Sequence, residues 1–254
     1  MIPPKNFATF VKIFCVSQAL VIIPTYNEIE NIAPILQRLL AMEQYDVLVV
    51  DDNSPDGTAN KVQEIAQNNP GRIYLEKRLK KKGLGTAYIH GFKWALERDY
   101  QYIFEMDADF SHNPDDLDYL YEACKNGADM SIGSRYVSGV NVVNWPMSRV
   151  LLSWLASKYV RFITGMDIHD TTAGFVCYQR RVLEAINLNK IQFIGYAFQI
   201  EMKFKAYLKK FTIIEVPVIF TDRFRGKSKM SGGIISEAIF GVIKLKLKSI
   251  FSSP

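Results

Sequence analysis

The chain has 254 residues and a formal net charge of +5, and 48% of its residues are hydrophobic and 13% aromatic. So large an apolar fraction excludes intrinsic disorder, and this length is enough for one large domain with its own buried core. Three cysteines, odd in number and far apart, exclude a disulfide-stapled scaffold and a zinc site built on cysteine alone. They are typical of small core residues in a reducing compartment: Cys15, Cys124 and Cys177.

The positive charge is concentrated at the C-terminal end of the chain. Residues 201–254 contain 11 Lys and Arg against 4 Asp and Glu, a net charge of +7, whereas residues 1–200 are slightly acidic. A whole-chain charge of +5 does not indicate a nucleic-acid-binding protein. The uneven distribution instead favours an anionic partner for the C-terminal segment.

The N-terminal segment is interpreted as a leader ahead of the domain, covering residues 1–17. Its phenylalanines and Lys5 imitate a weak signal peptide, but Lys12 interrupts the apolar run, and cleavage nearby would damage the motif that follows. No stretch of about 18 apolar residues is free of charge, so no membrane span is expected. The chain is therefore expected to stay in the cytosol.

From residue 19 onward, short apolar runs alternate with amphipathic stretches. Continuous β-branched runs between amphipathic helices predict an α/β fold with a mostly parallel sheet buried on both faces. The predicted strands are Ala19–Ile23, Val47–Val50, Arg72–Leu75, Tyr102–Met106, Met130–Ile132 and Ile213–Phe220, and the predicted helices are Glu28–Met42, Pro55–Gln67 and Thr86–Glu97.

Polar clusters follow three of these strands, at Pro24–Glu28, Asp51–Gly57 and Asp107–Asp109. Ligands of such sheets bind beyond the carboxyl ends of the strands, so we expect the three clusters to form one site. Each cluster alone also has a structural explanation, since Asn27, Ser54 and Asp56 are residue types that cap helices.

Two aspartates one residue apart carry the most specific chemistry. Asp107 and Asp109 at a strand end suit a hard divalent cation, Mg²⁺ or Mn²⁺, that also takes oxygens from a substrate phosphate. A lone pair of this kind is a weak motif, and both residues are also common in turns. The adjacent pair Asp51 and Asp52 suits hydrogen bonds to a base or to ribose hydroxyls.

Basic residues for an anionic substrate occur in three separate stretches. Arg135 follows the strand predicted at Met130–Ile132, and residues 221–229 combine four basic side chains with Gly226 and Ser228. Arginine matches phosphate oxygens, and a loop containing glycine and serine is suited to closing over them, although a solvated charge run is the alternative. Residues 77–85 form a basic, glycine-containing helix entry that lacks the P-loop pattern.

Other catalytic patterns are missing. The sequence has no nucleophile elbow of the form Gly-x-Ser-x-Gly. Its three histidines, His90, His112 and His169, lack the spacing of metal ligands and are interpreted as structural.

Together these stretches resemble one family, the dolichyl-phosphate (polyprenyl-phosphate) mannosyltransferases within the family 2 glycosyltransferases of GT-A fold. The similarity runs from about residue 18 to residue 240. It is carried by Pro-Thr-Tyr-Asn-Glu at 24–28, Asp-Asp-Asn-Ser-Pro-Asp-Gly-Thr at 51–58, Gly-Leu-Gly-Thr-Ala-Tyr at 83–88, Asp-Ala-Asp at 107–109, Gly-Ser-Arg-Tyr at 133–136 and the Asp-Arg…Ser-Lys stretch at 222–229.

The resemblance implies a Rossmann-like catalytic domain over residues 18–230 and a basic amphipathic helix over 231–254. It also implies that Asp107 and Asp109 bind the metal and that Asp109, Arg135 and Arg223 take part in catalysis. Some relatives have glutamine as a further metal ligand where this chain has Ser111. The implied sugar-nucleotide site consists of Pro24, Tyr26, Glu28, Val50, Asp52, Asp107, Ala108, Asp109, Arg135, Arg223 and Lys229.

The implied reaction transfers mannose from GDP-mannose to a dolichyl or polyprenyl phosphate with inversion at the anomeric carbon. The acceptor phosphate is largely a dianion at pH 7, because its second pKa is about 6, so no general base is expected. The alternatives are a polyprenyl-phosphate transferase for glucose or an N-acetylhexosamine and, from another class, a sugar-nucleotide nucleotidyltransferase. The Gly-rich first loop of that other class is replaced here by Pro24–Glu28.

A lipid acceptor implies contact with a membrane surface. Two segments, 145–164 and 234–251, combine large apolar residues with interspersed Lys and Arg, which is typical of interfacial amphipathic helices. Packing of both helices into the core is the alternative. We expect peripheral attachment at the cytosolic face, with lipid phosphates rather than nucleic acid as the partner of the basic C-terminal segment.

Overall fold

The computed structural model describes residues 17–195, 197–222 and 233–251. Seven strands form one sheet in the order β3-β2-β1-β4-β7-β5-β8, and a short second sheet pairs β6 with β9. The strands are β1 (Ala19–Thr25), β2 (Tyr45–Asp51), β3 (Ile73–Lys77), β4 (Tyr102–Glu105), β5 (Met130–Ser134), β6 (Val142–Val143), β7 (Val176–Gln179), β8 (Ile213–Pro217) and β9 (Phe220–Thr221).

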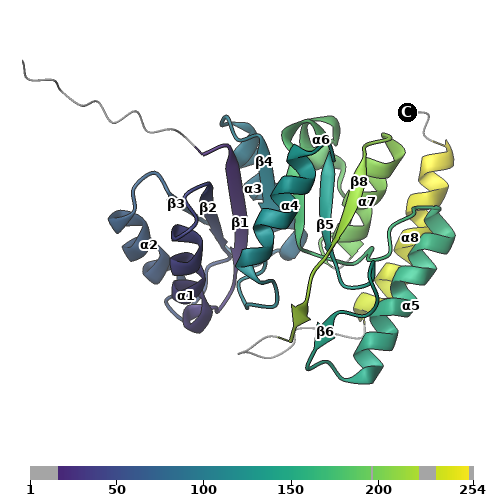
Figure 1. Ribbon diagram of the computed structural model, residues 1–254, viewed down its shortest axis with the longest axis horizontal. Helices are drawn as coiled ribbons and strands as arrows, with labels where there is room; N and C mark the ends of the chain where they lie inside the picture. Colours follow the sequence, from purple (N-terminus) through teal and green to yellow (C-terminus); the bar gives the residue numbers. More distant parts are fainter. Residues whose placement is uncertain (1–16, 196, 223–232, 252–254) are drawn as a thin grey trace, which may run out of the picture.

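Helices cover both faces of the large sheet (Figure 1). One face carries α1 (Ile29–Leu40), α2 (Thr58–Asn68) and α4 (Leu117–Lys125). The other carries α3 (Leu84–Leu96), α5 (Met147–Thr164), α6 (Arg180–Ala185), α7 (Ala197–Leu208) and α8 (Gly233–Phe251). Two 3₁₀ turns, Pro114–Asp116 and Leu188–Lys190, precede α4 and α7.

Alternation along the strands explains how both faces are filled. In β1, Leu20 and Ile22 pack in one core cluster, while Ala19, Val21 and Ile23 pack in the other. Successive strand residues point to opposite faces, so a continuous apolar run is what a sheet covered on both sides requires. The expected α/β fold with a mostly parallel sheet is confirmed.

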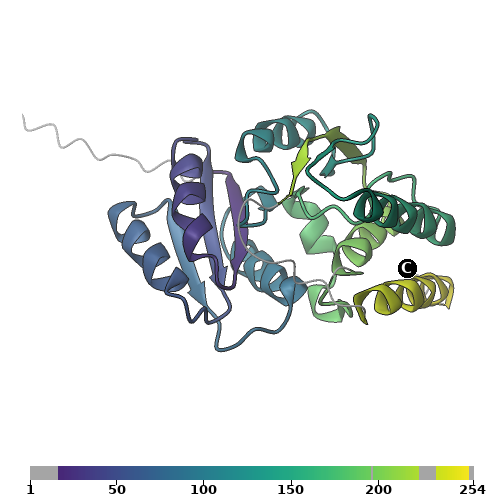
Figure 2. The ribbon, with the colours of Figure 1, turned by 90° about the horizontal axis from the view of Figure 1, so that it is seen from below.

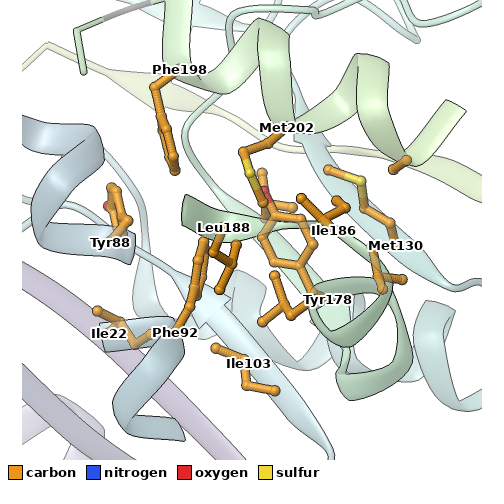
Figure 3. Packing of buried hydrophobic residues seen from close by; sticks show 14 of the residues in the cluster. Ile22, Tyr88, Phe92, Ile103, Met130, Tyr178, Ile186, Leu188, Phe198 and Met202 are labelled. Atoms are coloured by element: carbon orange, nitrogen blue, oxygen red, sulfur yellow. The ribbon is translucent and has the colours of Figure 1, made fainter. Parts of the chain in front are cut away.

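The larger core cluster lies beneath α3 and α7. Figure 3 shows Phe92 of α3 and Met202 of α7 converging on Tyr178 of β7, which is fully buried. Helix α3 approaches the sheet so closely that a Cβ at Gly91 would lie 2.6 Å from Ile22. This contact fixes α3, whose first turn belongs to the site described below.

β7 is the exception to the parallel arrangement. It pairs antiparallel with both β4 and β5, with Val176 opposite Glu105 and Ile132. The segment that precedes β7 therefore lies at the edge of the sheet where the neighbouring strands β4 and β5 end. We call this side of the sheet, with Thr25, Asp51, Glu105 and Ser134 at the ends of β1, β2, β4 and β5, the site edge; Figure 2, seen from below, looks toward it.

One predicted strand is wrong in its extent. The run Ile213–Phe220 was expected as a single strand, but β8 ends at Pro217 and β9 begins at Phe220. β8 pairs with β5 and β9 pairs with β6, so the chain leaves the large sheet between them. Pro217 lacks an N–H for ladder pairing, which is consistent with a strand end at this position.

Helices α5 and α8 pack against each other at one end of the molecule (Figures 1 and 2). Within the described residues, no helix combines the length and the apolar character needed to cross a membrane. The leader over 1–17 lies outside the described residues except for Ser17.

Candidate active site

The site edge brings together the polar clusters that follow β1, β2 and β4. Thr25 and Asp51 are register partners at the ends of β1 and β2, and the N–H of Asp52 donates to the carbonyl of Thr25. The N–H of Met106 bonds to Ile22, so the chain after β4 continues beside β1. The three clusters are neighbours in the sheet, as the strand-end rule predicts.

Asp51 is part of the framework of this site. Its carboxylate is fully buried and accepts hydrogen bonds from the Thr25 hydroxyl at 2.8 Å and from the Ser54 hydroxyl at 2.6 Å. Ser54 Oγ in turn accepts the N–H of Asn27, which has a positive φ of 59°. Asp51 therefore ties the loop after β1 to the loop after β2.

Asp56 explains why two helices begin beside the same edge. Its carboxylate accepts the N–H of Ile29, the first residue of α1, at 3.1 Å and the N–H of Thr58, the first residue of α2, at 3.0 Å. These hydrogen bonds lower the pKa of Asp56 although burial opposes ionisation. For Asp56 the helix-capping interpretation is correct.

Asp52 binds an arginine that sequence reasoning did not single out. The Arg78 guanidinium meets both carboxylate oxygens, at 2.5 and 2.8 Å, and its third nitrogen donates to Thr86 Oγ1 at 2.9 Å. Asp52 is only 6% exposed. This bidentate pair therefore links the end of β2 to the first turn of α3, where the predicted nucleoside site lies.

Replacing Arg78 by Met should weaken both stability and nucleotide binding. The change leaves the buried carboxylate of Asp52 unpaired, which costs about 3 kcal/mol of unfolding free energy. We expect KM for the sugar nucleotide to rise about tenfold with little change in kcat, because Asp52 is no longer held in place at the predicted nucleoside site. Arg38→Met is the matched control, since Arg38 pairs with the half-exposed Asp115; its effect on the free energy should stay below about 1 kcal/mol. Urea unfolding and steady-state kinetics measure both, and equal effects in the two variants would contradict the assignment.

The remaining predicted nucleoside residues line the same edge. Pro24 and Val50 are register partners in β1 and β2. The Lys81 ammonium lies 4.4 Å from the centre of the Tyr26 ring. Glu28 accepts a hydrogen bond from the Asn31 side chain at 2.9 Å. The structure thus places these four residues and Asp52 around the ends of two adjacent strands.

Asp107 and Asp109 follow β4 in a sharply turned loop. Phe110 has a positive φ of 60°, and the N–H of Ser111 returns to Asp109 Oδ1 at 3.1 Å. The Tyr88 hydroxyl, from α3, lies 3.3 Å from Asp107 Oδ1. Ser111 itself is buried, and its backbone N–H is what contacts Asp109.

The donor set fits a divalent cation that is shared with a substrate. No group of three or more His, Cys, Asp or Glu side chains forms a ligand cluster in the described part of the chain. Mg²⁺ is commonly bound by one or two carboxylates plus phosphate oxygens and waters, and Asp107 and Asp109 supply that number. These two residues would therefore hold the metal once a diphosphate is bound.

His112 holds this loop from behind. Its Nδ1 accepts the N–H of Asp107 at 3.0 Å, and its ring stacks on Phe175 with centroids 4.8 Å apart. Burial lowers the pKa of His112 to about 4, with the charge of nearby Asp109 acting in the opposite direction. His112 is therefore a neutral structural residue at pH 7, as predicted.

The buried neutral imidazole should make folding stability depend on pH. The pKa of His112 in the folded state, about 4, lies below the usual 6.5, so the unfolded chain binds more protons between these values. His112 should therefore remove up to about 3 kcal/mol of stability as the pH falls from 6.5 to 4. Comparing wild type with His112→Gln by urea unfolding in EDTA isolates this contribution. Parallel pH profiles for the two proteins would contradict it.

Arg135 is held by a residue that sequence reasoning missed. Its guanidinium binds both oxygens of Asp170, at 2.6 and 2.5 Å, and donates to the Thr172 hydroxyl at 2.8 Å. Arg135 is 7% exposed and Asp170 is fully buried. The sequence feature that could have indicated Asp170 is the polar run Asp170–Thr172, which precedes the apolar run Phe175–Tyr178. Polar residues at the start of a strand reach the site edge only because β7 is antiparallel.

Aromatic rings surround the same guanidinium. The centres of the Tyr136, Trp145 and Phe220 rings lie 5.3 to 5.4 Å from the carbon of the Arg135 guanidinium. Arg149, at the start of α5, stacks on Trp145 at 3.8 Å and pairs with Asp222 at 2.7 Å. The short β6–β9 sheet and α5 are thereby fastened beside Arg135.

A cleft of about 730 Å³ opens next to the Asp107–Phe110 loop. Its lining includes Phe110, Asp116, Val218 and Asp222, so it is bounded by the loop after β4 and by the segment from β8 to β9. A second cleft of about 320 Å³ lies along Arg78, Lys80, Lys82 and His90 at the entry of α3. Arg223 and Lys229, also predicted to contact phosphates, lie outside the described residues.

The fold and these residues define a class of protein. A mostly parallel sheet carries two carboxylates after β4, which suit a divalent cation, and an aspartate after β2, which suits a ribose hydroxyl. The family model for glycosyl transferase family 2 matches residues 20–186. The chain belongs to this family, and it is a glycosyltransferase.

Curated relatives narrow the comparison. The chain is 50% identical over 226 residues to polyprenol monophosphomannose synthase of Mycolicibacterium smegmatis, covering 89% of this chain and 85% of the relative. It is 47% identical over 228 residues to undecaprenyl-phosphate mannosyltransferase of Micrococcus luteus, covering 89% and 93%. It is also 40% identical over 230 residues to dolichol-phosphate mannosyltransferase of Pyrococcus furiosus, covering 89% and 62%. The resemblance drawn from the sequence motifs is confirmed.

Solved structures confirm the GT-A fold. Glucosyl-3-phosphoglycerate synthase from Mycobacterium tuberculosis, in complex with Mn²⁺, UDP and glucosyl-3-phosphoglycerate, superposes with a TM-score of 0.65 at 14% identity, covering 93% of this chain and 81% of that one. A mannosyltransferase from Pyrobaculum calidifontis in complex with GDP-mannose and Mn²⁺ has a TM-score of 0.60 at 17% identity, covering 93% and 65%.

Proposed function

We propose that this glycosyltransferase moves mannose from GDP-mannose to a polyprenyl phosphate, with Mg²⁺ or Mn²⁺ and with inversion of the anomeric carbon. The observation that carries the proposal is the placement of Asp107 and Asp109 beside the Asp52–Arg78 pair on one sheet edge. The names of the curated relatives support mannose and a polyprenyl phosphate as the substrates.

The donor is expected to lie across the ends of β1, β2 and β4. The guanosine would contact Tyr26, Glu28 and Asp52, while the diphosphate would lie over the loop from Asp107 to Asp109. A bound metal would neutralise charge that develops on the departing GDP. Asp107 and Asp109 would hold that metal, and the Tyr88 hydroxyl fixes the Asp107 carboxylate.

Arg135 supplies a permanent positive charge next to the same loop. Because Asp170 binds its guanidinium on one side, the side chain is fixed before substrate arrives. Preorganised charge of this kind stabilises a transition state without reorganisation at the moment of reaction. Arg223 and Lys229, in the stretch that follows Asp222 in the sequence, are proposed to contact phosphates.

The acceptor phosphate is its own nucleophile. As a dianion it has no proton to lose, so an in-line attack opposite the leaving diphosphate needs no general base. The cleft of about 730 Å³ beside Phe110 is the proposed entry for this group. If Asp116, a carboxylate that lines this cleft, proved essential for transfer yet dispensable for binding Mn²⁺ and GDP-mannose, this mechanism would be contradicted.

Membrane attachment is proposed through α5 and α8. Each helix buries one side in the core, through Val160 in α5 and Val242 in α8. Each also exposes large apolar side chains, with Phe162 87% and Phe251 83% exposed. Basic residues accompany them, since Lys158 lies over the Trp154 ring and Lys246 bridges from α8 to the Thr164 carbonyl of α5. Apolar anchors beside lysines are typical of helices that lie in a lipid interface.

A double substitution, Phe162→Glu with Phe251→Glu, should weaken binding to vesicles by at least about tenfold, because two apolar anchors become charged. Sedimentation with vesicles of 70% phosphatidylcholine and 30% phosphatidylglycerol measures the effect. Tyr119→Glu is the control, since Tyr119 is 64% exposed on α4, on the opposite face of the sheet. Point variants are preferable to deleting 234–254, which would uncover core residues behind α8. Equal vesicle binding by the double variant and wild type would reject this surface.

The donor sugar and the acceptor class are tested together. The enzyme is incubated with radiolabelled GDP-mannose, UDP-glucose or a UDP-N-acetylhexosamine, each with Mn²⁺ and polyprenyl phosphate, and label is counted in the organic phase. We expect label from GDP-mannose alone and none without the lipid phosphate. Transfer from a UDP-sugar would replace the donor assignment. Formation of a nucleoside triphosphate from the sugar nucleotide and added pyrophosphate would instead indicate a nucleotidyltransferase.

A further inference from the structure

Helix α7 buries an unusual set of polar side chains. Gln199 is 4% exposed, and Glu201 and Lys203 are fully buried. Charged side chains are almost never buried completely unless they are paired, because removing them from water is costly. None of the three side chains belongs to the proposed substrate site. The residues that they contact show which segments α7 holds in place.

Lys203 reaches the segment that carries the partner of Arg135. Its Nζ donates to the carbonyl of Ala173 at 2.6 Å, and Gln199 provides two further oxygens at 3.4 and 3.5 Å. Ala173 lies three residues after Asp170, and Gly174 follows it. The ammonium thus anchors the backbone of the 170–174 segment from beneath.

Gln199 reaches the other half of the site. Its Nε2 donates to Glu105 Oε2 at 2.5 Å, and the Tyr178 hydroxyl lies 3.3 Å from Glu105 Oε1. Glu105 ends β4, two residues before Asp107. One turn of α7 therefore contacts the strand that delivers the metal-binding loop and also the segment that delivers Asp170.

We propose that Lys203, together with Gln199, is a positioning residue that sets the 170–174 segment, and through it Arg135, relative to Asp107 and Asp109. The proposal rests on the proposed transfer reaction. Its physical basis is the continuous chain of contacts from Glu105 through Gln199 and Lys203 to Ala173, and from Asp170 to Arg135.

The second support of the same segment lies on the opposite side. Glu215 of β8 accepts the N–H groups of His169 at 2.7 Å and Asp170 at 2.8 Å. With Lys203 below and Glu215 beside it, the segment is fixed at both of its ends. Loss of the Lys203 contact should therefore shift the Ala173 end and tilt Asp170, leaving the loop after β4 in place.

A competing role for Lys203 is compensation of the buried Glu105 charge. Burial lowers the pKa of Lys203 to about 8 and raises the pKa of Glu105 to about 8, while the attraction between the two opposite charges acts against both shifts. If charge compensation is the role of Lys203, removing both charges should restore both folding and turnover. The positioning role predicts that removal of both restores folding alone, because the bond to the Ala173 carbonyl is still missing.

The test compares Lys203→Met, the double variant Glu105→Gln with Lys203→Met, and Lys209→Met as the control. Lys209 is exposed just beyond the same helix. Two readouts are used: transfer kinetics, and hydrogen exchange of the amides of Arg135 and residues 170–174. The exchange experiment needs no activity, so it remains informative even if GDP-mannose proves not to be the donor.

We expect kcat of the double variant to fall about 10²-fold, as for a misplacement near 1 Å, with Mn²⁺ affinity and KM for GDP-mannose within about threefold of wild type. Exchange protection should fall in residues 170–174 and remain unchanged in the sheet. The double variant carries no lone buried charge and should fold even if Lys203→Met does not. Recovery of wild-type kcat in the double variant, or unchanged exchange at residues 170–174, would overturn the proposal.

Discussion

Asp109→Asn is expected to lower mannosyl transfer by at least about 10³-fold, because one of the two carboxylates proposed to hold the metal loses its charge. The melting temperature should stay near that of wild type, since asparagine keeps an oxygen that can accept the Ser111 N–H. Mn²⁺ binding followed by electron paramagnetic resonance, in the presence of GDP, should weaken in parallel with activity.

The matched control for this prediction is Asp99→Asn. Asp99 is exposed in the turn before β4 and carries the same charge change. Its activity and Mn²⁺ affinity should equal those of wild type. An Asp109→Asn enzyme with wild-type turnover would remove the metal site from the 107–109 loop.

Asp170→Asn is the second substitution with a large expected effect, on both folding and turnover. Burial opposes ionisation of Asp170, but the Arg135 guanidinium outweighs it and holds the pKa of this carboxyl below its usual value. Asparagine leaves the buried arginine without its counter-charge, which should cost about 3–5 kcal/mol of unfolding free energy. Turnover should fall as well, because Arg135 is no longer held beside the diphosphate site.

A double variant separates these two effects. Arg135→Met with Asp170→Asn removes both buried charges, so stability should recover to within about 1–2 kcal/mol of wild type. Transfer should remain lost, because the positive charge itself is missing. Urea unfolding and single-turnover kinetics on the same samples measure the two quantities. Recovered transfer in the double variant would show that Arg135 has no part in the reaction.

The polar clusters on the parallel half of the site edge were predictable from the sequence. The polar clusters after β1, β2 and β4 each follow an apolar run in the sequence. Because the carboxyl ends of parallel strands lie at one edge of the sheet, the three clusters were expected to lie together. Asp52, Asp107 and Asp109 were predicted in this way, and the structure places them after β2 and β4 at the site edge. The capping role of Asp56 was also visible, since its residue type and position before a helix are diagnostic.

The antiparallel half was hidden from the same reasoning. Asp170 precedes an apolar run instead of following one, so only the reversed direction of β7 brings it to Arg135. Arg78 belongs to a basic stretch in which several residues look equivalent, and only the folded loop selects it as the partner of Asp52. No sequence pattern marks the polar side chains of α7, because the partners of Gln199 and Lys203 come from two segments far away along the chain.

The two faces of α5 and α8 show a limit of amphipathic patterns. Lipid contact and core packing were alternatives for each helix, yet the structure shows a buried side and an exposed apolar side on both. A helix that is apolar around most of its circumference satisfies both interpretations. The arrangement gives each helix a place in the core and leaves an apolar surface at one end of the molecule.

The most direct test of the proposed donor site is a crystal structure grown with Mn²⁺ and GDP, in which anomalous scattering locates the metal. We expect one Mn²⁺ peak in contact with the carboxylates of Asp107 and Asp109 and with the diphosphate, and a guanine near Tyr26 and Asp52. A Mn²⁺ ion bound away from both aspartates, or a nucleotide lying across another edge of the sheet, would contradict it.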